Sequence, residues 1–369
     1  NPQITFFKVV YRRHTNFSME AIEQTWNGTS SGANSRCTAT ISRNGDLVHR
    51  MYFEITASAA LINVDNPGAV FIKDVELEIG GQKIDKHSGE WMETWAELTE
   101  PNPTGARYTG PAAGGTLFQK MSGMGGVNSD AALTDTKYII PLQFWFCRNP
   151  GLALPLIALQ YHEVKVILNH RITTSYESSA TNSLFCDYIY LDTDERRRFA
   201  QVSHEYLIEQ VQEQSLTNSL TNDLNFNHPV KELVWTAASY QTGASGNGET
   251  ETGAVGAGTY QLKLNGHDRF AARDFRYFTR TQVWQHHTGC GGLDTATAGT
   301  TTGAMDDSIA VYSFALKPEE HQPSGTCNFS RIDNAQLVCG HTQSCDLIFA
   351  VNYNVLRIMS GMGGLAYSN

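Results

Sequence analysis

Alternating apolar and polar positions dominate this chain. A period of two is typical of half-buried β-strands, and the segments that show it are rich in Thr, Val, Ile and aromatic residues. In the first half they predict strands over residues 16–26, 38–41, 48–57, 72–79, 137–146, 164–168 and 185–191. In the second half they predict strands over residues 206–212, 224–226, 232–237, 260–264, 309–316, 335–338 and 347–352. Seven or eight strands per half favour an all-β fold of the β-sandwich or jelly-roll kind.

Helical patterns are sparse. Residues 88–98 predict a helix, with Ser88 as N-cap and Trp91, Trp95 and Leu98 spaced three to four residues apart. Residues 154–161 predict one or two helical turns. Segments rich in Gly, Ala, Ser and Thr separate the strands and predict long loops, which would gather at the ends of a sandwich. They cover residues 27–36, 99–135, 172–182, 241–258 and 289–305.

A weak internal repeat divides the chain. The stretch from Val75 to Gln82 returns as Tyr260 to His267, an offset of 260 − 75 = 185. Ile22-Glu23-Gln24 returns as Ile208-Glu209-Gln210, an offset of 186, and residues 47–53 resemble residues 229–235, an offset of 182. Residues 144–146 pair with residues 313–316 at about 170. Similar strands in one order predict two copies of one β-unit.

The most charged stretch of the chain, residues 192–198, is the expected seam between these units. We therefore expect an N-terminal domain over residues 1–198 and a C-terminal domain over residues 199–369, each of ordinary domain size. The hexapeptide Met-Ser-Gly-Met-Gly-Gly occurs at residues 121–126 and 359–364, out of register with the repeat. We interpret it as a glycine-rich loop used twice.

Composition narrows the class of protein. The 369 residues carry a formal net charge of −10, which argues against a nucleic-acid-binding surface. No apolar run approaches the ~18 residues of a membrane-spanning helix. Seven cysteines without a Cys-x-x-Cys pair favour reduced, mostly buried thiols in a protein assembled inside a cell. The sequence starts at Asn1, so we expect a processed, trimmed or disordered start.

Long motifs run along the whole chain. The N-terminal motif Asn1-Pro2-Gln3-Ile4-Thr5 is followed by Tyr11-Arg12-Arg13. Further motifs cover residues 15–17, 42–47, 74–82, 150–164, 323–334 and 352–367. Together these motifs resemble the major capsid proteins of nucleocytoplasmic large DNA viruses, most closely those of algal (chlorella virus-like) members. Members usually have a short arm before the N-terminal motif, which this sequence lacks.

This resemblance implies a double jelly roll, two eight-stranded antiparallel sandwiches in tandem with few short helices. It implies a homotrimer with a nearly hexagonal outline that tiles an icosahedral virus shell. The partners would be further copies of the chain, neighbouring capsomers and minor capsid proteins, with an inner virion membrane nearby but not spanned. The protein would be assembled in the host cytoplasm, reside in the virion and carry glycans, without binding nucleic acid directly.

No motif for catalysis, cofactor binding or metal binding is present, so we expect a protein that is not an enzyme. His286-His287-x-x-Cys290 lacks a second pair of ligands, and we interpret it as structural. We interpret His162-Glu163 and His204-Glu205 as polar strand-edge or interface residues. Arg196 to Arg198 follow three acidic residues and are expected to form a self-paired linker.

Three sequons mark candidate glycosylation sites. Asn27 lies in a predicted polar loop and is expected to be the most accessible. Asn16 and Asn328 lie in patterned segments that predict packed, unmodified side chains.

Two other functions remain open from the residues alone. A carbohydrate-binding jelly roll requires exposed aromatic side chains, whereas the six tryptophans lie mostly in segments patterned as core: Trp26, Trp91, Trp95, Trp145, Trp235 and Trp284. A jelly-roll glycosidase requires two facing carboxylates, which sequence cannot pair.

Overall fold

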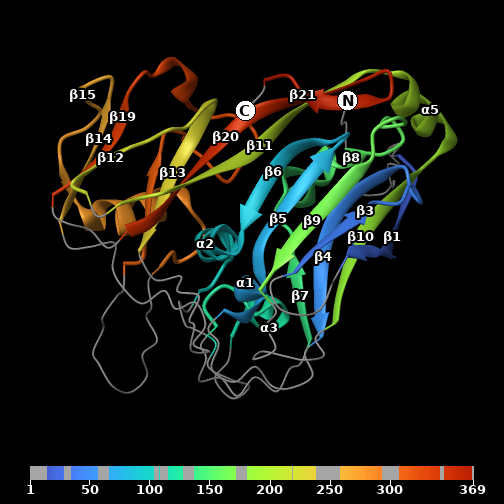
Figure 1. The fold of residues 1–369 in the computed structure, drawn as a ribbon, viewed down its shortest axis with the longest axis horizontal. Coiled ribbons are helices and arrows are strands. Elements are labelled where there is room, and N and C mark those ends of the chain that lie inside the picture. The colour runs from blue at the N-terminus through green and yellow to red at the C-terminus, as the bar shows by residue number, and fades with distance from the viewer. Residues whose placement is uncertain are drawn as a thin grey trace, which may run out of the picture.

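The chain forms two β-sandwiches side by side, a double jelly roll, in the computed structural model (Figure 1). The structure describes residues 15–28, 35–56, 66–103, 108, 115–127, 137–171, 181–217, 219–237, 258–292, 307–340 and 345–367. Every strand pair among these residues is antiparallel, for example β1 with β10 and β11 with β20. The predicted all-β class is therefore confirmed.

The first sandwich consists of two sheets. Sheet I has the order β1 (Phe17–Gln24), β10 (Thr181–Leu191), β4 (Leu47–Thr56), β7 (Lys137–Pro141), with β8 (Leu154–Pro155) paired to β4. Sheet II has the order β2 (Trp26–Gly28), β3 (Arg36–Thr40), β9 (Val164–His170), β5 (Ile72–Ile79), β6 (Gln82–Ser88). Residues 16–26, predicted as one strand, therefore supply strands to both sheets.

The second sandwich repeats this arrangement. Sheet III has the order β11 (His204–Ser215), β20 (Cys345–Met359), β13 (Pro229–Ala237), β17 (Ile309–Ser313), with β18 (Cys327–Asn328) on β13 and β21 (Met362–Leu365) on β20. Sheet IV has the order β12 (Thr221–Asp223), β19 (Ala335–Cys339), β14 (Thr259–Leu264), β15 (His267–Asp268), with β16 (Arg273–Asp274) on β14. The strand predicted at 224–226 is found three positions earlier, as β12.

Strand register confirms the sequence repeat. Tyr52 on β4 pairs with Phe185 and Pro141, and Val234 on β13 pairs with Phe349 and Val311. The offsets are 234 − 52 = 182 and 311 − 141 = 170, as the sequence predicts. The 185-residue echo is a pair of equivalent hairpins, β5–β6 and β14–β15. Both turn through two residues with positive φ, which matches the right-handed twist of the flanking strands.

The helices are short. They are α1 (Pro67–Phe71), α2 (Gly89–Thr99), α3 (Leu117–Ser122), α4 (Trp145–Arg148), α5 (Thr193–Gln201) and α6 (Gln282–His286), with a π-helical turn η2 (Tyr277–Thr281) before α6 and 3₁₀ turns η1 (Pro150–Leu152) and η3 (Phe329–Arg331). The prediction for α2 is confirmed, including Ser88 as N-cap. None of the described helices is long and apolar enough to cross a membrane.

Four local predictions are wrong. The strand at 137–146 ends at Pro141, and α4 follows because three buried aromatic residues there close the sandwich end. The loop at 99–135 contains α3, which is stabilised by a capping box between Thr116 and Gln119. The linker at 192–198 is part of α5, capped by Asp192. Residues 154–161 form β8 and a turn rather than helical turns. The other predicted loops lie largely outside the described residues.

The repeated hexapeptide adopts two different structures. In the first copy, Gly123 ends α3 in the left-handed region, and the N–H groups of Gly125 and Gly126 donate to the buried Glu93 carboxylate. In the second copy, Ser360 and Gly361 form the turn of the β20–β21 hairpin. The interpretation as one loop used twice is therefore wrong.

Candidate assembly site at the seam between the sandwiches

Helix α2 lies between the two sandwiches (Figure 1). It begins where the Ser88 hydroxyl accepts a hydrogen bond from the Trp91 N–H at 3.2 Å. Met92 and Ala96 on one side of the helix pack into the core of the first sandwich. The opposite side packs on sheet III of the second sandwich, so this one helix joins the two cores.

The apolar contacts between α2 and the second sandwich are defined here as the seam cluster. Trp91, Trp95 and Leu98 of the helix cover side chains on the outer face of sheet III: Val234, Ile309, Val311, Phe349 and Val351. The ring centroids of Trp91 and Phe349 are 5.1 Å apart, and Phe349 is fully buried. Burial of this many large side chains makes the seam a hydrophobic core rather than a loose domain contact.

A short segment of the second sandwich also caps the carboxyl end of α2. The carbonyl oxygens of Glu97, Leu98 and Thr99 accept hydrogen bonds from this segment. The donors are Gly291 N at 2.9 Å, Gly289 N at 2.7 Å and Thr288 Oγ1 at 2.8 Å. A Cβ at Gly289 would lie 2.3 Å from the Glu97 oxygen, so only glycine fits here. The last carbonyls of the helix are thereby satisfied across the seam.

His287 holds that segment in place. Its Nε2 lies 3.0 Å from Glu232 Oε2 on β13, and its Nδ1 lies 3.1 Å from Glu319 Oε1. Burial alone would lower the pKa of His287, but the two carboxylates raise it to about 9. The imidazolium therefore donates from both nitrogens at neutral pH. This arrangement leaves His287 no lone pair to offer a metal ion.

A second buried ionic group lies beside α2. Glu209 on β11 forms an ion pair with Arg148 of α4, and its Oε1 lies 2.8 Å from Lys231 Nζ on β13. Lys231 is completely buried. Burial would raise the pKa of Glu209, but the two cations hold it well below its ordinary range. Arg148 also lies over the Trp95 ring at 4.9 Å, which links these charges to the seam cluster.

Polar contacts also join the edge strands β6 and β11 of the two sandwiches. Gln210 Nε2 donates to the Ile84 carbonyl on β6, and the Val211 N–H donates to Asp85 Oδ1 at 3.1 Å. The Ser88 hydroxyl donates to Glu213 at 2.6 Å. Sheet II of the first sandwich and sheet III of the second are thus joined directly.

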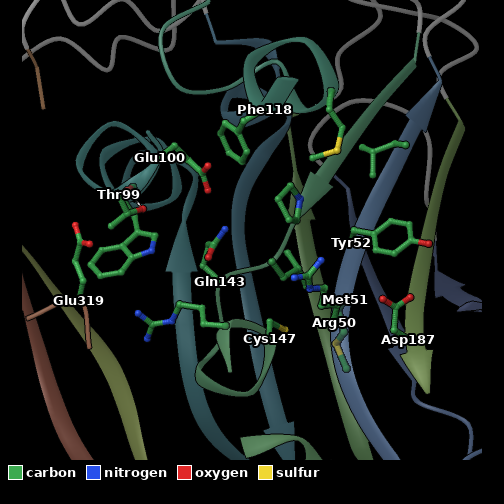
Figure 2. Close-up of a pocket in the computed structure, with 16 residues that line it drawn as sticks. Arg50, Met51, Tyr52, Thr99, Glu100, Phe118, Gln143, Cys147, Asp187 and Glu319 are labelled. Atoms are coloured by element: carbon green, nitrogen blue, oxygen red, sulfur yellow. Dashed lines mark hydrogen bonds between the residues drawn. The ribbon is translucent and has the colours of Figure 1, made fainter. Parts of the chain in front are cut away.

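An open groove of about 580 Å³ lies on the outer face of sheet I (Figure 2). Its floor includes Tyr52, Ile139, Pro141 and Asp187. Residues of α2, of its C-cap and of α3 form the walls: Trp95, Thr99, Glu100, Phe118 and Met121. Burial raises the pKa of Asp187 and of Glu100. Cys147 also lines the groove, and burial raises its pKa to about 12, so it is not a reactive thiolate.

The three sequon asparagines lie far apart in the fold. Asn16 is exposed just before β1, so the expected packed position is wrong. Asn27 is exposed as predicted, but it lies on the edge strand β2, opposite Thr38, rather than in a loop. Asn328 is half-buried on β18, and its side-chain oxygen accepts from the Ser330 N–H at 3.1 Å.

The other polar motifs have structural partners. His162 hydrogen-bonds the backbone of Gly363, and Glu205 pairs with Arg357 at 2.8 Å. Arg196 pairs with Asp46 of the first sandwich at 2.9 Å, so the expected self-paired linker is wrong for this residue. No cluster of three metal-ligating side chains occurs in the described part of the chain.

Sequence reasoning missed the seam residues. The spacing of Trp91, Trp95 and Leu98 predicted a buried helix face but not its partner. Glu209 and Lys231 gave no signal, because opposite charges 22 positions apart meet only through the sheet. The sequence signal that could have found the seam is that α2 has apolar residues on two sides. One side fills the core of its own sandwich, so the other side requires a second partner.

Comparison with known proteins identifies the family. A family model for the N-terminus of major capsid proteins matches residues 5–193, and a model for major capsid proteins of large eukaryotic DNA viruses matches residues 195–364. The chain is 51% identical to the major capsid protein of Pyramimonas orientalis virus, with 100% of this chain and 95% of that protein aligned. It is 40% identical to the major capsid protein of Paramecium bursaria Chlorella virus 1, with 100% and 95% aligned.

Solved structures of viral capsid proteins also match this chain. A quasi-atomic model of the PBCV-1 virus capsid matches with a TM-score of 0.78 and 36% identity, covering 99% of this chain and 100% of that chain. The Faustovirus major capsid protein matches with a TM-score of 0.66 at 13% identity, over 97% of this chain and 93% of that chain, which supports the fold alone. The chain therefore belongs to the major capsid proteins of large eukaryotic DNA viruses and is a structural protein of the virion, not an enzyme.

Proposed function

We propose that three copies of this chain form a capsomer with a nearly hexagonal outline, and that these capsomers tile an icosahedral shell. The observation that carries this proposal is the repeat: sheets III and IV reproduce the strand order of sheets I and II. Two similar units per chain, taken three times around an axis, give six similar units. The similarity to a chain of the PBCV-1 virus capsid supports the same assembly here.

The seam fits this role because it fixes the angle between the two units. A hexagonal outline requires the sandwiches to keep one orientation, and a hydrophobic seam with capped helix ends and buried ion pairs resists rotation. The division into residues 1–198 and 199–369 accords with this view, since α5 separates the strands of the two sandwiches.

We further propose that the capsomers contact each other and minor capsid proteins, and that assembly takes place in the host cytoplasm near an inner virion membrane. Glycans would occupy Asn27 and Asn16, which are exposed, before the half-buried Asn328. Intact-mass and peptide mass spectrometry of the virion protein would locate them; an unmodified mass would remove the glycan proposal.

Light scattering coupled to size-exclusion chromatography tests the assembly. The 40.8 kDa chain should elute as a particle of three times its mass, and electron micrographs should show six-lobed outlines. A strict monomer over a wide concentration range would overturn the proposal.

A further inference from the structure

The outer faces of sheets I and III carry equivalent residues in different surroundings. On sheet III the side chains under α2 are 0–1% exposed: Val234, Ile309, Val311, Phe349 and Val351. Strand register places four counterparts on sheet I at Tyr52, Ile139, Pro141 and Phe185, and the offset of 349 − 185 = 164 gives Asp187 as the counterpart of Val351. All five counterparts are only half-buried, and four of them line the groove. The groove on sheet I is thus the counterpart of the surface that α2 covers on sheet III.

The second sandwich also has a counterpart of α2. Val75 pairs with His87 on β6, and its repeat partner Tyr260 pairs with Arg273 on β16, an offset of 273 − 87 = 186. A helical segment follows each strand, α2 in the first sandwich and η2 with α6 in the second. At the same offset, Met92 corresponds to Phe278, and each packs into the core of its own sandwich.

The outward side of this second helical segment is uncovered. At the offset of 186, the α2 residues that cover sheet III correspond to Tyr277, Thr281 and Trp284, with the same spacing of four and three. Trp91, Trp95 and Leu98 are at most 4% exposed, whereas Tyr277 and Thr281 are half-buried and Trp284 is 80% exposed. The sequence pattern indicates core positions for most of the six tryptophans, and Trp284 is an exception.

We propose that the segment η2–α6 of one copy occupies the groove on sheet I of a second copy, with Trp284 as its anchor. This contact repeats between chains the seam that α2 makes within one chain. It rests on the proposed trimer, and it names the surfaces through which the trimer closes. A contact between two different surfaces is head-to-tail, and such contacts form a ring when the rotation closes.

Charge and position favour a second copy as the occupant. Arg273 and Arg276 are exposed just before the segment, and Glu20 and Glu23 are exposed on β1 at the edge of sheet I. The groove itself is lined by both acidic and basic residues, Glu100, Asp187 and Glu319 with Arg50 and Arg148, so the charge complementarity rests on the acidic residues of β1. Figure 1 shows β14 and β15 at the end of the molecule opposite β1 and β10, as a head-to-tail contact requires. A large aromatic side chain that enters an apolar pocket is a typical interface anchor.

Cross-linking tests the pairing directly. Trp91 and Phe349 lie 5.1 Å apart within the chain, so their counterparts Tyr277 and Phe185 should be neighbours across the interface. The variant Tyr277→Cys/Phe185→Cys, treated with a short bis-maleimide, should give covalent dimers and trimers in denaturing gels. Tyr277→Cys/Val202→Cys is the control, because Val202 is exposed beside α5 at the far end of the first sandwich. Equal cross-linking in both variants, or none in the first, would overturn the inference.

Trp284→Ala tests the anchor. The concentration at which trimers dissociate should rise on the order of 30-fold per interface. The thermal unfolding of the monomer should stay unchanged, because Trp284 is 80% exposed. Tyr161→Ala is a matched control, since this aromatic residue is 75% exposed at the β20–β21 end. If wild type is trimeric and Trp284→Ala dissociates no more than the control, the inference fails and the proposed function stands. If wild type is monomeric, both fail.

Discussion

The outer faces of sheets I and III show how one strand pattern can produce a buried interface and an accessible surface. Phe349 and Phe185 occupy equivalent positions, yet Phe349 is fully buried under Trp91 while Phe185 stacks on Tyr52 in a half-buried pair 5.6 Å apart. Equivalent charged residues of the two sheets also differ in burial. Glu209 on β11 is 3% exposed between two cations, while its counterpart Glu23 on β1 is exposed and hydrogen-bonds Ser183 at 2.7 Å.

This difference follows from what lies against each sheet. Sheet III meets α2, so its outer side chains are aliphatic or aromatic and its charges are paired. On sheet I, residues of α2 and α3 only wall the groove, and the open floor keeps Asp187 and Tyr52 where sheet III has Val351 and Val234. A surface that must remain soluble before assembly cannot be as apolar as a permanent core.

Truncation of the two equivalent phenylalanines, Phe349 and Phe185, should give the largest difference in stability between the two faces. Phe349→Ala removes a fully buried ring from the seam cluster and should lower the free energy of unfolding by about 3–5 kcal/mol. Phe185→Ala should cost about 1 kcal/mol, because its ring is half-exposed before assembly. Urea unfolding of the two variants at concentrations that keep the chain monomeric measures both. Similar losses would show that the two faces do not differ in the way their burial indicates.

Neutralisation of the two equivalent carboxylates, Glu209 and Glu23, should give the second-largest difference in stability. Glu209→Gln leaves the fully buried Lys231 with one fewer counter-charge and should cost about 3 kcal/mol. Glu23→Gln should change stability by less than about 0.5 kcal/mol, because Glu23 is exposed. The same unfolding experiment compares them. A mild Glu209→Gln effect would mean that the ionic group at the seam contributes little to holding the sandwiches together.

The strands and α2 could be predicted from sequence because their signals are local. Alternation marks a strand, register propagates along paired strands, and Ser88 followed by Trp91, Trp95 and Leu98 specifies a capped helix. The groove and the seam could not be predicted, because they depend on which face of one sandwich meets the other. Trp284 shows the same limit: its spacing repeats that of α2, but its exposure depends on a partner outside the chain.

The hexapeptide Met-Ser-Gly-Met-Gly-Gly shows that an identical local sequence does not by itself determine the local structure. After Leu117 to Lys120 it ends a helix around the buried Glu93, and after the long strand β20 it forms a hairpin turn. Glycine permits positive φ in both places, and the preceding element selects the structure. Among the candidate glycosylation sites, the exposure of Asn27 was predictable from polarity, whereas the exposure of Asn16 was not, because β1 is an edge strand.

The smallest expected effect is a pH dependence of the free energy of unfolding. It should arise from His287 at the covered face of sheet III and have no equivalent at sheet I. The folded pKa of His287 is about 9, above the ordinary 6.5, because Glu232 and Glu319 overcome the effect of burial. A raised pKa means that this stabilisation is fully present below pH 6.5 and is lost as the pH rises through 9. Between pH 7 and pH 10 the loss should be about 2–3 kcal/mol. The counterpart of Glu232 on sheet I is Arg50, so the open face has no equivalent group.

The comparison of wild type with His287→Gln isolates this effect from every other group that titrates at high pH. Glutamine retains hydrogen-bonding capacity but carries no titrating proton, so the variant should be less stable at pH 7 and approach wild type near pH 10. The amides of Gly289 and Gly291 cap α2 next to His287, and the Thr288 amide donates to Glu319. Hydrogen exchange at these three amides should therefore accelerate together in wild type as the pH rises, beyond the intrinsic increase. Unfolding curves that stay parallel from pH 7 to pH 10 would mean that the imidazolium does not hold the seam, and that the seam cluster and the Glu209 group fix the two sandwiches by themselves.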